Sequence, residues 1–120
     1  MNAANITTMV GMIMKEPVFI KTRDGLEFEA RFILGVKRAY KTKEGKSVFD
    51  YIPVRFNGEN KMPFAHSIHA KSIVSVAGSM QSENYEKDGV QRMSLFLNAE
   101  SIQWTPRPRE EEGYTLDLPL

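Results

Sequence analysis

The sequence of 120 residues contains no cysteine. This absence excludes disulfide bonds and thiolate metal ligands, and it fits a reducing compartment. No apolar run approaches the roughly 20 residues that a membrane-spanning helix needs. The opening stretch MNAANITTMVGMIMKEP lacks the basic region and the small-residue cleavage site of a signal peptide, so it predicts a first strand instead. We therefore expect a cytoplasmic protein without a membrane partner.

Charge is unevenly distributed, although the formal net charge is only +1. Residues 1–109 hold all 16 Lys and Arg against 11 Asp and Glu, which gives +5. Residues 110–120 hold four acids and no base, which gives −4. A basic body with an acidic end is a pattern of functional interest, but terminal acids also simply aid solubility. Charge alone leaves both interpretations open.

Most of the chain has the alternating, β-branched and aromatic pattern of strands. Asp24-Gly25 predicts a first hairpin, and Lys87-Asp88-Gly89 predicts a last one between two long strands. The stretch KRAYKTKEGKS predicts a basic loop, and NKMPFAHSIHAKS contains the only short helix that the pattern supports. In the second arm of the first hairpin, one parity forms a core face, made of Phe28, Phe32, Leu34 and Val36.

This order of elements predicts an all-β fold in which about five strands form a small Greek-key barrel with one short helix. The oligonucleotide-binding (OB) fold has this outline, and an SH3-like or another small β-barrel also fits the pattern. After Trp104 the composition changes to TPRPREEEGYTLDLPL. We therefore expect a domain over residues 1–104 and a Pro/Glu-rich linker with an acidic C-terminal tail over residues 105–120.

The strand GKSVFDYIPVRFNGE places unusual side chains on the face that should contact solvent. One parity forms a core side, made of Val48, Ile52, Val54 and Phe56. The other parity carries Tyr51, Pro53, Arg55 and Asn57. A flat ring can stack on a nucleobase, and a guanidinium can neutralise a phosphate. A single exposed tyrosine is otherwise an ordinary amphipathic surface residue.

The neighbouring residues favour the interpretation as a nucleic-acid-binding face. Just before this strand lie six cationic or aromatic residues, namely Lys37, Arg38, Tyr40, Lys41, Lys43 and Lys46. The stretch SENYEKDG places Tyr85 near the tip of the last hairpin. Aromatic side chains interleaved with bases are typical of proteins that bind single-stranded nucleic acid.

His66 and His69 offer a rival site, because their spacing of three residues can ligate a metal. No cysteine accompanies them and the predicted helix contains no acid, which favours two structural histidines over a metalloenzyme. The sequence also lacks a Ser/His/Asp arrangement, a Gly-rich phosphate loop and an HExxH motif. We predict no catalytic residue, no metal and no cofactor.

Five stretches taken together resemble the bacterial-type single-stranded DNA-binding protein (SSB) family: ITTMVGMIMKEP, EARFILGVKRAY, FDYIPV, VAGSMQSENYEKDG and LNAESIQW. The resemblance covers about residues 5–104 and indicates a divergent member. It implies an OB-fold and sequence-independent binding and protection of single-stranded DNA in DNA replication, recombination or repair. It also implies a nucleoid-associated homo-oligomer, typically a homotetramer, although a dimer is compatible with the sequence.

The family stacks bases on aromatic residues at four positions, and three of these match Tyr40, Tyr51 and Tyr85. The remaining position falls on Asn57, with Phe56 one residue earlier. Parity places Phe56 in the core, unless a bulge at Asn57-Gly58 turns it outward. The cations expected to contact phosphates are Lys37, Arg38, Lys41, Lys43, Lys46 and Arg55.

The tail resembles the acidic SSB terminus that docks into replication and repair proteins. Its expected partner-binding residues are Asp117, Leu118, Pro119 and Leu120. Leu120 stands where the family has a terminal Phe, which suggests an altered choice of partner. The alternative function keeps the fold: an SSB-related accessory protein, primosomal or recombinational, that acts mainly through protein contacts and for which the tail matters more than the tyrosines.

Overall fold

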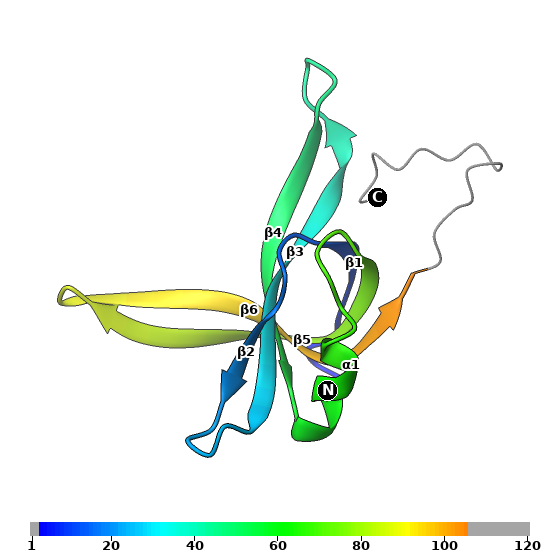
Figure 1. The fold of residues 1–120 in the computed structure, drawn as a ribbon. Helices are drawn as coiled ribbons and strands as arrows, with labels where there is room; N and C mark the ends of the chain where they lie inside the picture. The colour runs from blue at the N-terminus through cyan, green and yellow to red at the C-terminus, as the bar shows by residue number, and fades with distance from the viewer. Residues whose placement is uncertain (1–2, 106–120) are drawn as a thin grey trace.

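The structure of the chain, a computed structural model, describes residues 3–105 and is built almost entirely of strands (Figure 1). The strands are β1 (Thr7–Ile13), β2 (Val18–Lys21), β3 (Glu27–Lys41), β4 (Ser47–Asn57), β5 (Ile73–Lys87) and β6 (Val90–Trp104). A 3-10 turn, η1 (Glu59–Lys61), and a one-turn helix, α1 (Met62–Ala65), lie between β4 and β5. Within residues 3–105 no helix is long and apolar enough to cross a bilayer.

The strands close into a barrel of five positions. β1 and β2 pair with successive parts of β3, since Met12 lies opposite Gly35 and Val18 lies opposite Arg31. These two short strands therefore share one position. Around the barrel, β3 pairs with β4, β4 with β6 in parallel, β6 with β5, and β5 with β1. The predicted five-stranded Greek-key barrel with one short helix is confirmed.

The core lies inside this barrel and follows the predicted parity. Phe32 and Leu34 of β3 and Val54 and Phe56 of β4 are buried, and they pack with side chains from every other barrel position. These further core residues are Ile13, Ala30, Met62, Ala65, Ile68, Val74, Val76, Leu97, Ala99 and Ile102. Burying this continuous apolar set is the main force that holds the barrel closed.

The helix is shorter than the sequence suggested. Pro63 is placed in its first turn, where a missing N–H costs no hydrogen bond, and the helix ends at Ala65. His66 is already its C-cap, and His69 lies beyond it. The prediction that both histidines share a helix is therefore wrong.

Two pairs of strands extend beyond the barrel as ribbons that project in different directions (Figure 1). We call residues 37–50 the β3–β4 arm and residues 81–95 the β5–β6 arm. The β5–β6 arm reverses at Asp88 and Gly89, whose φ values of 53° and 77° form the two-residue turn that suits paired strands.

The β3–β4 arm corrects the predicted basic loop. Lys37 to Lys41 belong to β3, and the reversal is confined to residues 42–46, where the Thr42 N–H donates to the Lys46 carbonyl over 2.9 Å. Lys37 pairs with Phe49 and Lys41 with Ser47, so β3 holds three residues where β4 holds one. This irregularity bends the arm locally.

Candidate nucleic-acid interface

The outer face of β3 and β4 carries the central part of the candidate interface. We define the outer face by Tyr51, Pro53 and Arg55 on β4 and by their direct partners on β3, Gly35, Ile33 and Arg31. Directly paired residues of antiparallel strands share a face, and alternate residues point the other way. Tyr51 is 60% exposed, as the parity of the sequence predicts.

A methionine lies across from the Tyr51 ring. Gly35 is directly opposite Tyr51, and a Cβ atom on Gly35 would lie 2.6 Å from Sδ of Met14. The Met14 side chain therefore fills the place that a β3 side chain would take. Any larger residue at position 35 would require the Met14 side chain to move.

Arg55 connects the outer face to the β5–β6 arm. Its Nη1 donates to Oε2 of Glu83 over 2.6 Å, and its Cζ lies 3.9 Å from the centroid of the Phe96 ring. The side chain is consequently only 21% exposed. The predicted phosphate contact of Arg55 thus belongs to a guanidinium that already has a carboxylate partner.

Tyr85 continues the same surface. Glu83 and Tyr85 are two residues apart in β5 and therefore point to the same side of the arm. Tyr85 is 42% exposed and lies directly across from Arg92 of β6. Tyr51, Arg55, Glu83 and Tyr85 thus follow one another along a single surface from β4 onto the β5–β6 arm.

Tyr40 lies on the other side of the β3–β4 arm. Arg38 binds the Asp50 carboxylate through Nε and Nη2, over 3.0 and 2.7 Å, and its Nη1 donates to the Tyr40 hydroxyl over 2.5 Å. Asp50 precedes Tyr51 in β4, so the two side chains point to opposite faces. Tyr40 is 58% exposed. A single strand that contacted both Tyr40 and Tyr51 would have to pass around the arm.

The Arg38–Asp50 pair is held in its charged form. Hydrogen bonds from Arg38 lower the pKa of the Asp50 carboxyl below its ordinary value of 3.8. The hydrogen bond to Asp50, followed by the one to Tyr40, raises the pKa of Arg38. A phosphate contact by Arg38, as the sequence predicts, would compete with Asp50.

The predicted lysines are placed differently. Lys41, Lys43 and Lys46 are exposed at the end of the β3–β4 arm, and Lys37 is half-buried nearer the barrel. Within residues 3–105 none of these four lysines forms an ion pair. They are therefore available to phosphates without giving up a carboxylate.

Two arginines on the same surface were missed by sequence reasoning. Arg31 lies directly opposite Arg55, and Arg92 lies directly opposite Tyr85. The sequence contained a signal for Arg92, since counting back from the turn at Asp88-Gly89 pairs residue 85 with residue 92. It contained none for Arg31, because the register between β3 and β4 depends on an irregular arm.

Burial decides which of the two side chains, Phe56 or Asn57, faces outward. Phe56 is 4% exposed, and its ring packs edge-on against Phe64 at 6.4 Å. The alternative in which a bulge turns Phe56 outward is therefore wrong, and Phe56 offers no ring face to a ligand. Asn57 is exposed, and its Nδ2 donates to Oδ1 of Asn98 over 3.1 Å. An amide pair thus stands where the resemblance implies a fourth ring.

The two histidines bind separate carboxylates. Nε2 of His66 lies 2.6 Å from Oε1 of Glu27, and its ring stacks on Phe19 at 3.9 Å. Nδ1 of His69 lies 3.1 Å from Oε2 of Glu16, and this hydrogen bond lowers the pKa of Glu16. Residues 3–105 contain no group of three or more His, Cys, Asp or Glu that could hold a metal. The described part of the chain therefore gives the metalloenzyme alternative no site.

Comparison with known families matches residues 4–105 to the model described as "Single-strand binding protein family". The chain belongs to this family. The suspected resemblance is thereby confirmed, and the members of the family are binding proteins rather than enzymes.

Three relatives of the chain are named single-stranded DNA-binding protein. The protein of Clostridium tetani is 27% identical over 101 residues, which cover 83% of this chain and 69% of that protein. Single-stranded DNA-binding protein 2 of Staphylococcus aureus strain Mu50 is 29% identical over 101 residues, which cover 83% of this chain and 71% of that protein. The Bacillus cereus protein is 30% identical over 110 residues, covering 91% of this chain and 64% of its own length.

Solved structures share the fold. A small single-stranded DNA-binding protein from Streptomyces coelicolor has a TM-score of 0.62 and 22% identity, over 83% of this chain and 93% of that one. The Plasmodium falciparum SSB, solved in complex with ssDNA, has a TM-score of 0.73 and 14% identity, over 88% of this chain and 98% of that one. Both agree with a barrel of the SSB type.

The tail residues predicted to bind partners lie outside the described residues. They are Asp117, Leu118, Pro119 and Leu120, and the acidic run of residues 110–112 lies there as well. Their role stays a prediction.

Proposed function

We propose that this chain binds single-stranded DNA without strong sequence preference. The observation that carries the proposal is the line of Tyr51, Arg55, Glu83 and Tyr85 along one surface of an SSB-family barrel. Relatives named single-stranded DNA-binding proteins and a neighbour solved with ssDNA support the same ligand.

Base stacking would supply the salt-independent part of the affinity. Tyr51 and Tyr85 would stack bases along the outer face, and Tyr40 would stack one on the opposite side of the β3–β4 arm. Each stacked base is worth about 1–3 kcal/mol, and every base has a ring face, so stacking tolerates any sequence. Asn57 supplies no ring, so we expect three stacking positions of the family type.

Phosphate contacts would supply the salt-dependent part. Lys41, Lys43 and Lys46 are exposed and without ion pairs among residues 3–105, and Lys37 lies close behind them. Each phosphate contact to a single strand contributes about −0.7 to the slope of log K against log salt. Arg38 and Arg55 would add contacts only when a phosphate displaces Asp50 or Glu83.

The wider role that we infer is protection of single strands in replication, recombination or repair at the nucleoid. Assembly into a homo-oligomer, and docking of replication or repair proteins by Asp117 to Leu120, belong to the same proposal. They depend on the resemblance to the SSB family and on the acidic end of the sequence.

Equilibrium titration with oligo-dT and with a duplex of equal length, at two salt concentrations, tests the proposal. We expect tight binding of oligo-dT that weakens as salt rises, and much weaker binding of the duplex. Equal affinity for both would contradict a single-strand binder. Binding of neither, with retention of a protein partner through the tail, would support the accessory-protein alternative.

A further inference from the structure

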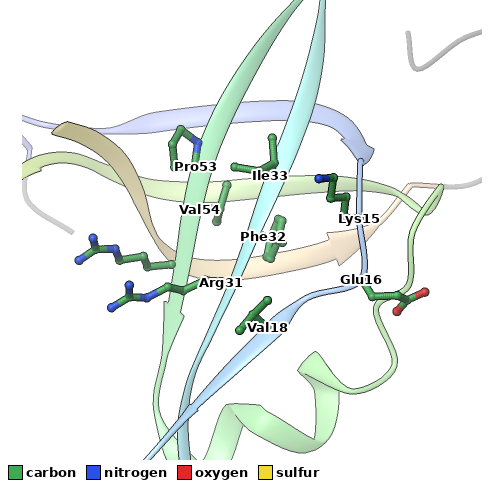
Figure 2. A pocket seen from close by; sticks show the side chains of 9 residues that line it. Lys15, Glu16, Val18, Arg31, Phe32, Ile33, Pro53 and Val54 are labelled. Atoms are coloured by element: carbon green, nitrogen blue, oxygen red, sulfur yellow. The ribbon is translucent and has the colours of Figure 1, made fainter.

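An apolar hollow of about 340 Å³ opens between the outer face of β3 and β4 and the segment that joins β1 to β2 (Figure 2). The stacking positions and lysine contacts proposed above assign no role to its apolar residues Val18, Ile33 and Pro53. Val18, Ile33 and Pro53 line its apolar part, and its charged lining residues are Lys15, Glu16, Arg31 and Arg55.

The hollow exists because β1 and β2 do not form one continuous strand. The Met14 N–H donates to the Ile33 carbonyl over 3.0 Å, and regular pairing resumes only at Val18, opposite Arg31. Between these points Lys15 and Glu16 leave the line of the sheet. Ile33 therefore has no regularly paired strand residue on the side of β3 away from β4, and its side chain and that of its partner Pro53 border the hollow.

The lining separates apolar from charged groups. Ile33, Pro53 and Val18 provide an apolar floor and wall. Arg31 and Arg55 lie side by side as direct cross-strand partners at one end, and Lys15 and Glu16 lie at the other (Figure 2). Arg31 pairs through Nε with the buried Glu29, yet its side chain stays 45% exposed. An apolar floor next to an exposed guanidinium suits a ligand with a flat ring and an adjacent negative charge.

We propose that the hollow holds one nucleobase of the bound strand, next to the base stacked on Tyr51. This inference rests on the proposed single-strand binding. Pro53 is two residues from Tyr51 on the same face, which places the two about 7 Å apart along β4. The volume lies at the lower end of the roughly 300–1,000 Å³ range of small-ligand pockets. Non-aromatic side chains would thus provide a further base position on a surface that has Asn57 in place of a ring.

A single introduced thiol tests the proposal, because the natural chain contains no cysteine. Val18→Cys places the thiol on the wall of the hollow, at a position that is 61% exposed. Leu26→Cys is the matched control, since Leu26 is 50% exposed but lies in the turn before β3, away from the hollow. The rate of alkylation by N-ethylmaleimide is measured with and without saturating oligo-dT.

We expect oligo-dT to slow alkylation of Val18→Cys at least about tenfold and to leave Leu26→Cys unchanged. Alkylation before DNA is added should weaken binding for Val18→Cys only, by about threefold to tenfold, as expected from losing one apolar base contact. Unchanged alkylation in the presence of bound oligo-dT would overturn the subsite and leave the proposed function intact. Protection without loss of affinity after alkylation would place the strand over the hollow rather than in it, and would also overturn the proposal. If neither variant nor the natural chain bound oligo-dT, the proposed function itself would fail.

A second pair of variants separates the floor from the rim. Ile33→Thr keeps a β-branched side chain but makes the floor more polar, so affinity should fall about threefold with an unchanged salt slope. Arg31→Gln should instead make the salt slope shallower by about 0.7. An Ile33→Thr variant with natural affinity for oligo-dT at high salt would contradict base binding in the hollow.

Discussion

The two arms that leave the barrel have the same construction but different chemistry. The β3–β4 arm, residues 37–50, holds five Lys and Arg against two Asp and Glu, a balance of +3. The β5–β6 arm, residues 81–95, holds two bases against three acids, a balance of −1, and it exposes Val90, Met93 and Leu95. The first arm therefore carries an excess of cations, whereas the second has almost no net charge and exposes apolar side chains.

From this difference we expect the proposed affinity to divide into a salt-dependent part on the β3–β4 arm and a salt-independent part on the β5–β6 arm. Contacts on the β3–β4 arm should depend on salt, since exposed charges are screened beyond a Debye length of about 10 Å at 0.1 M. Stacking on Tyr85 should persist at high salt. Arg55 and Glu83 connect the two parts, because their ion pair joins β4 to the β5–β6 arm.

The largest expected effect comes from the end of the β3–β4 arm. Changing Lys41, Lys43 and Lys46 together to Gln should remove three phosphate contacts and make the salt slope shallower by about 2. Affinity for oligo-dT at about 0.1 M salt should then fall about a hundredfold, measured by titration across a salt series. A control with Lys21→Gln, Arg23→Gln and Lys71→Gln removes the same charge outside both arms and should change the slope much less. Equal slopes for the two triple variants would contradict the division between the arms.

The next effect tests the β5–β6 arm. Tyr85→Ala should weaken binding about tenfold, because it removes one stacked base, and the loss should be similar at low and high salt. At high salt this loss should exceed that of Lys46→Ala, whose contact is screened. Tyr85→Phe keeps the ring and serves as the control, with affinity near that of the natural chain. A larger loss for Lys46→Ala than for Tyr85→Ala at high salt would show that Tyr85 is not a stacking position.

Removing the ion pair between Arg55 and Glu83 should increase the affinity for oligo-dT. Glu83→Gln removes the carboxylate that holds Arg55, so the guanidinium can contact a phosphate. We expect affinity at low salt to rise about threefold to fivefold and the salt slope to steepen by about 0.7. Glu86→Gln makes the same chemical change on the opposite side of the arm and should have a smaller effect. Weaker binding by Glu83→Gln would mean that the ion pair positions the arm for the strand rather than competing with it.

The smallest effect concerns pH and the Arg38–Asp50 pair. The pKa of Asp50 is lowered in the folded protein, so its stabilising contribution is complete above the ordinary value of 3.8 and is lost as pH falls through the folded value. The Tm difference between the natural chain and Asp50→Asn should thus be constant from about pH 5 to 8 and disappear below 3.8. It should also be small, because the two side chains are 42% and 44% exposed. A difference that changes between pH 5 and 8, measured by thermal melts, would show that another group controls it.

Local patterns predicted much of the molecule because they act over a few residues. The alternation in GKSVFDYIPVRFNGE placed Val54 and Phe56 in the core and Tyr51 and Arg55 outside. Burial agrees at the first three positions, whereas Arg55 is only 21% exposed because it pairs with Glu83. The Asp-Gly pair placed the last hairpin, since only a few residue types accept the positive φ of such a turn. The basic stretch was misread as a loop, because its charges gave no sign that β3 continues to Lys41.

The sequence by itself determined the parity of the strands, the three exposed tyrosines and the excess of cations on one arm. Only the tertiary structure decided that Asp50 and Glu83 pair with Arg38 and Arg55, and that Tyr40 lies on the opposite side of its arm from Tyr51. It also decided that the break between β1 and β2 leaves a hollow above Ile33 and Pro53. The physical reason is that a side chain's face follows from its own strand, whereas its partners depend on the register between strands far apart in sequence.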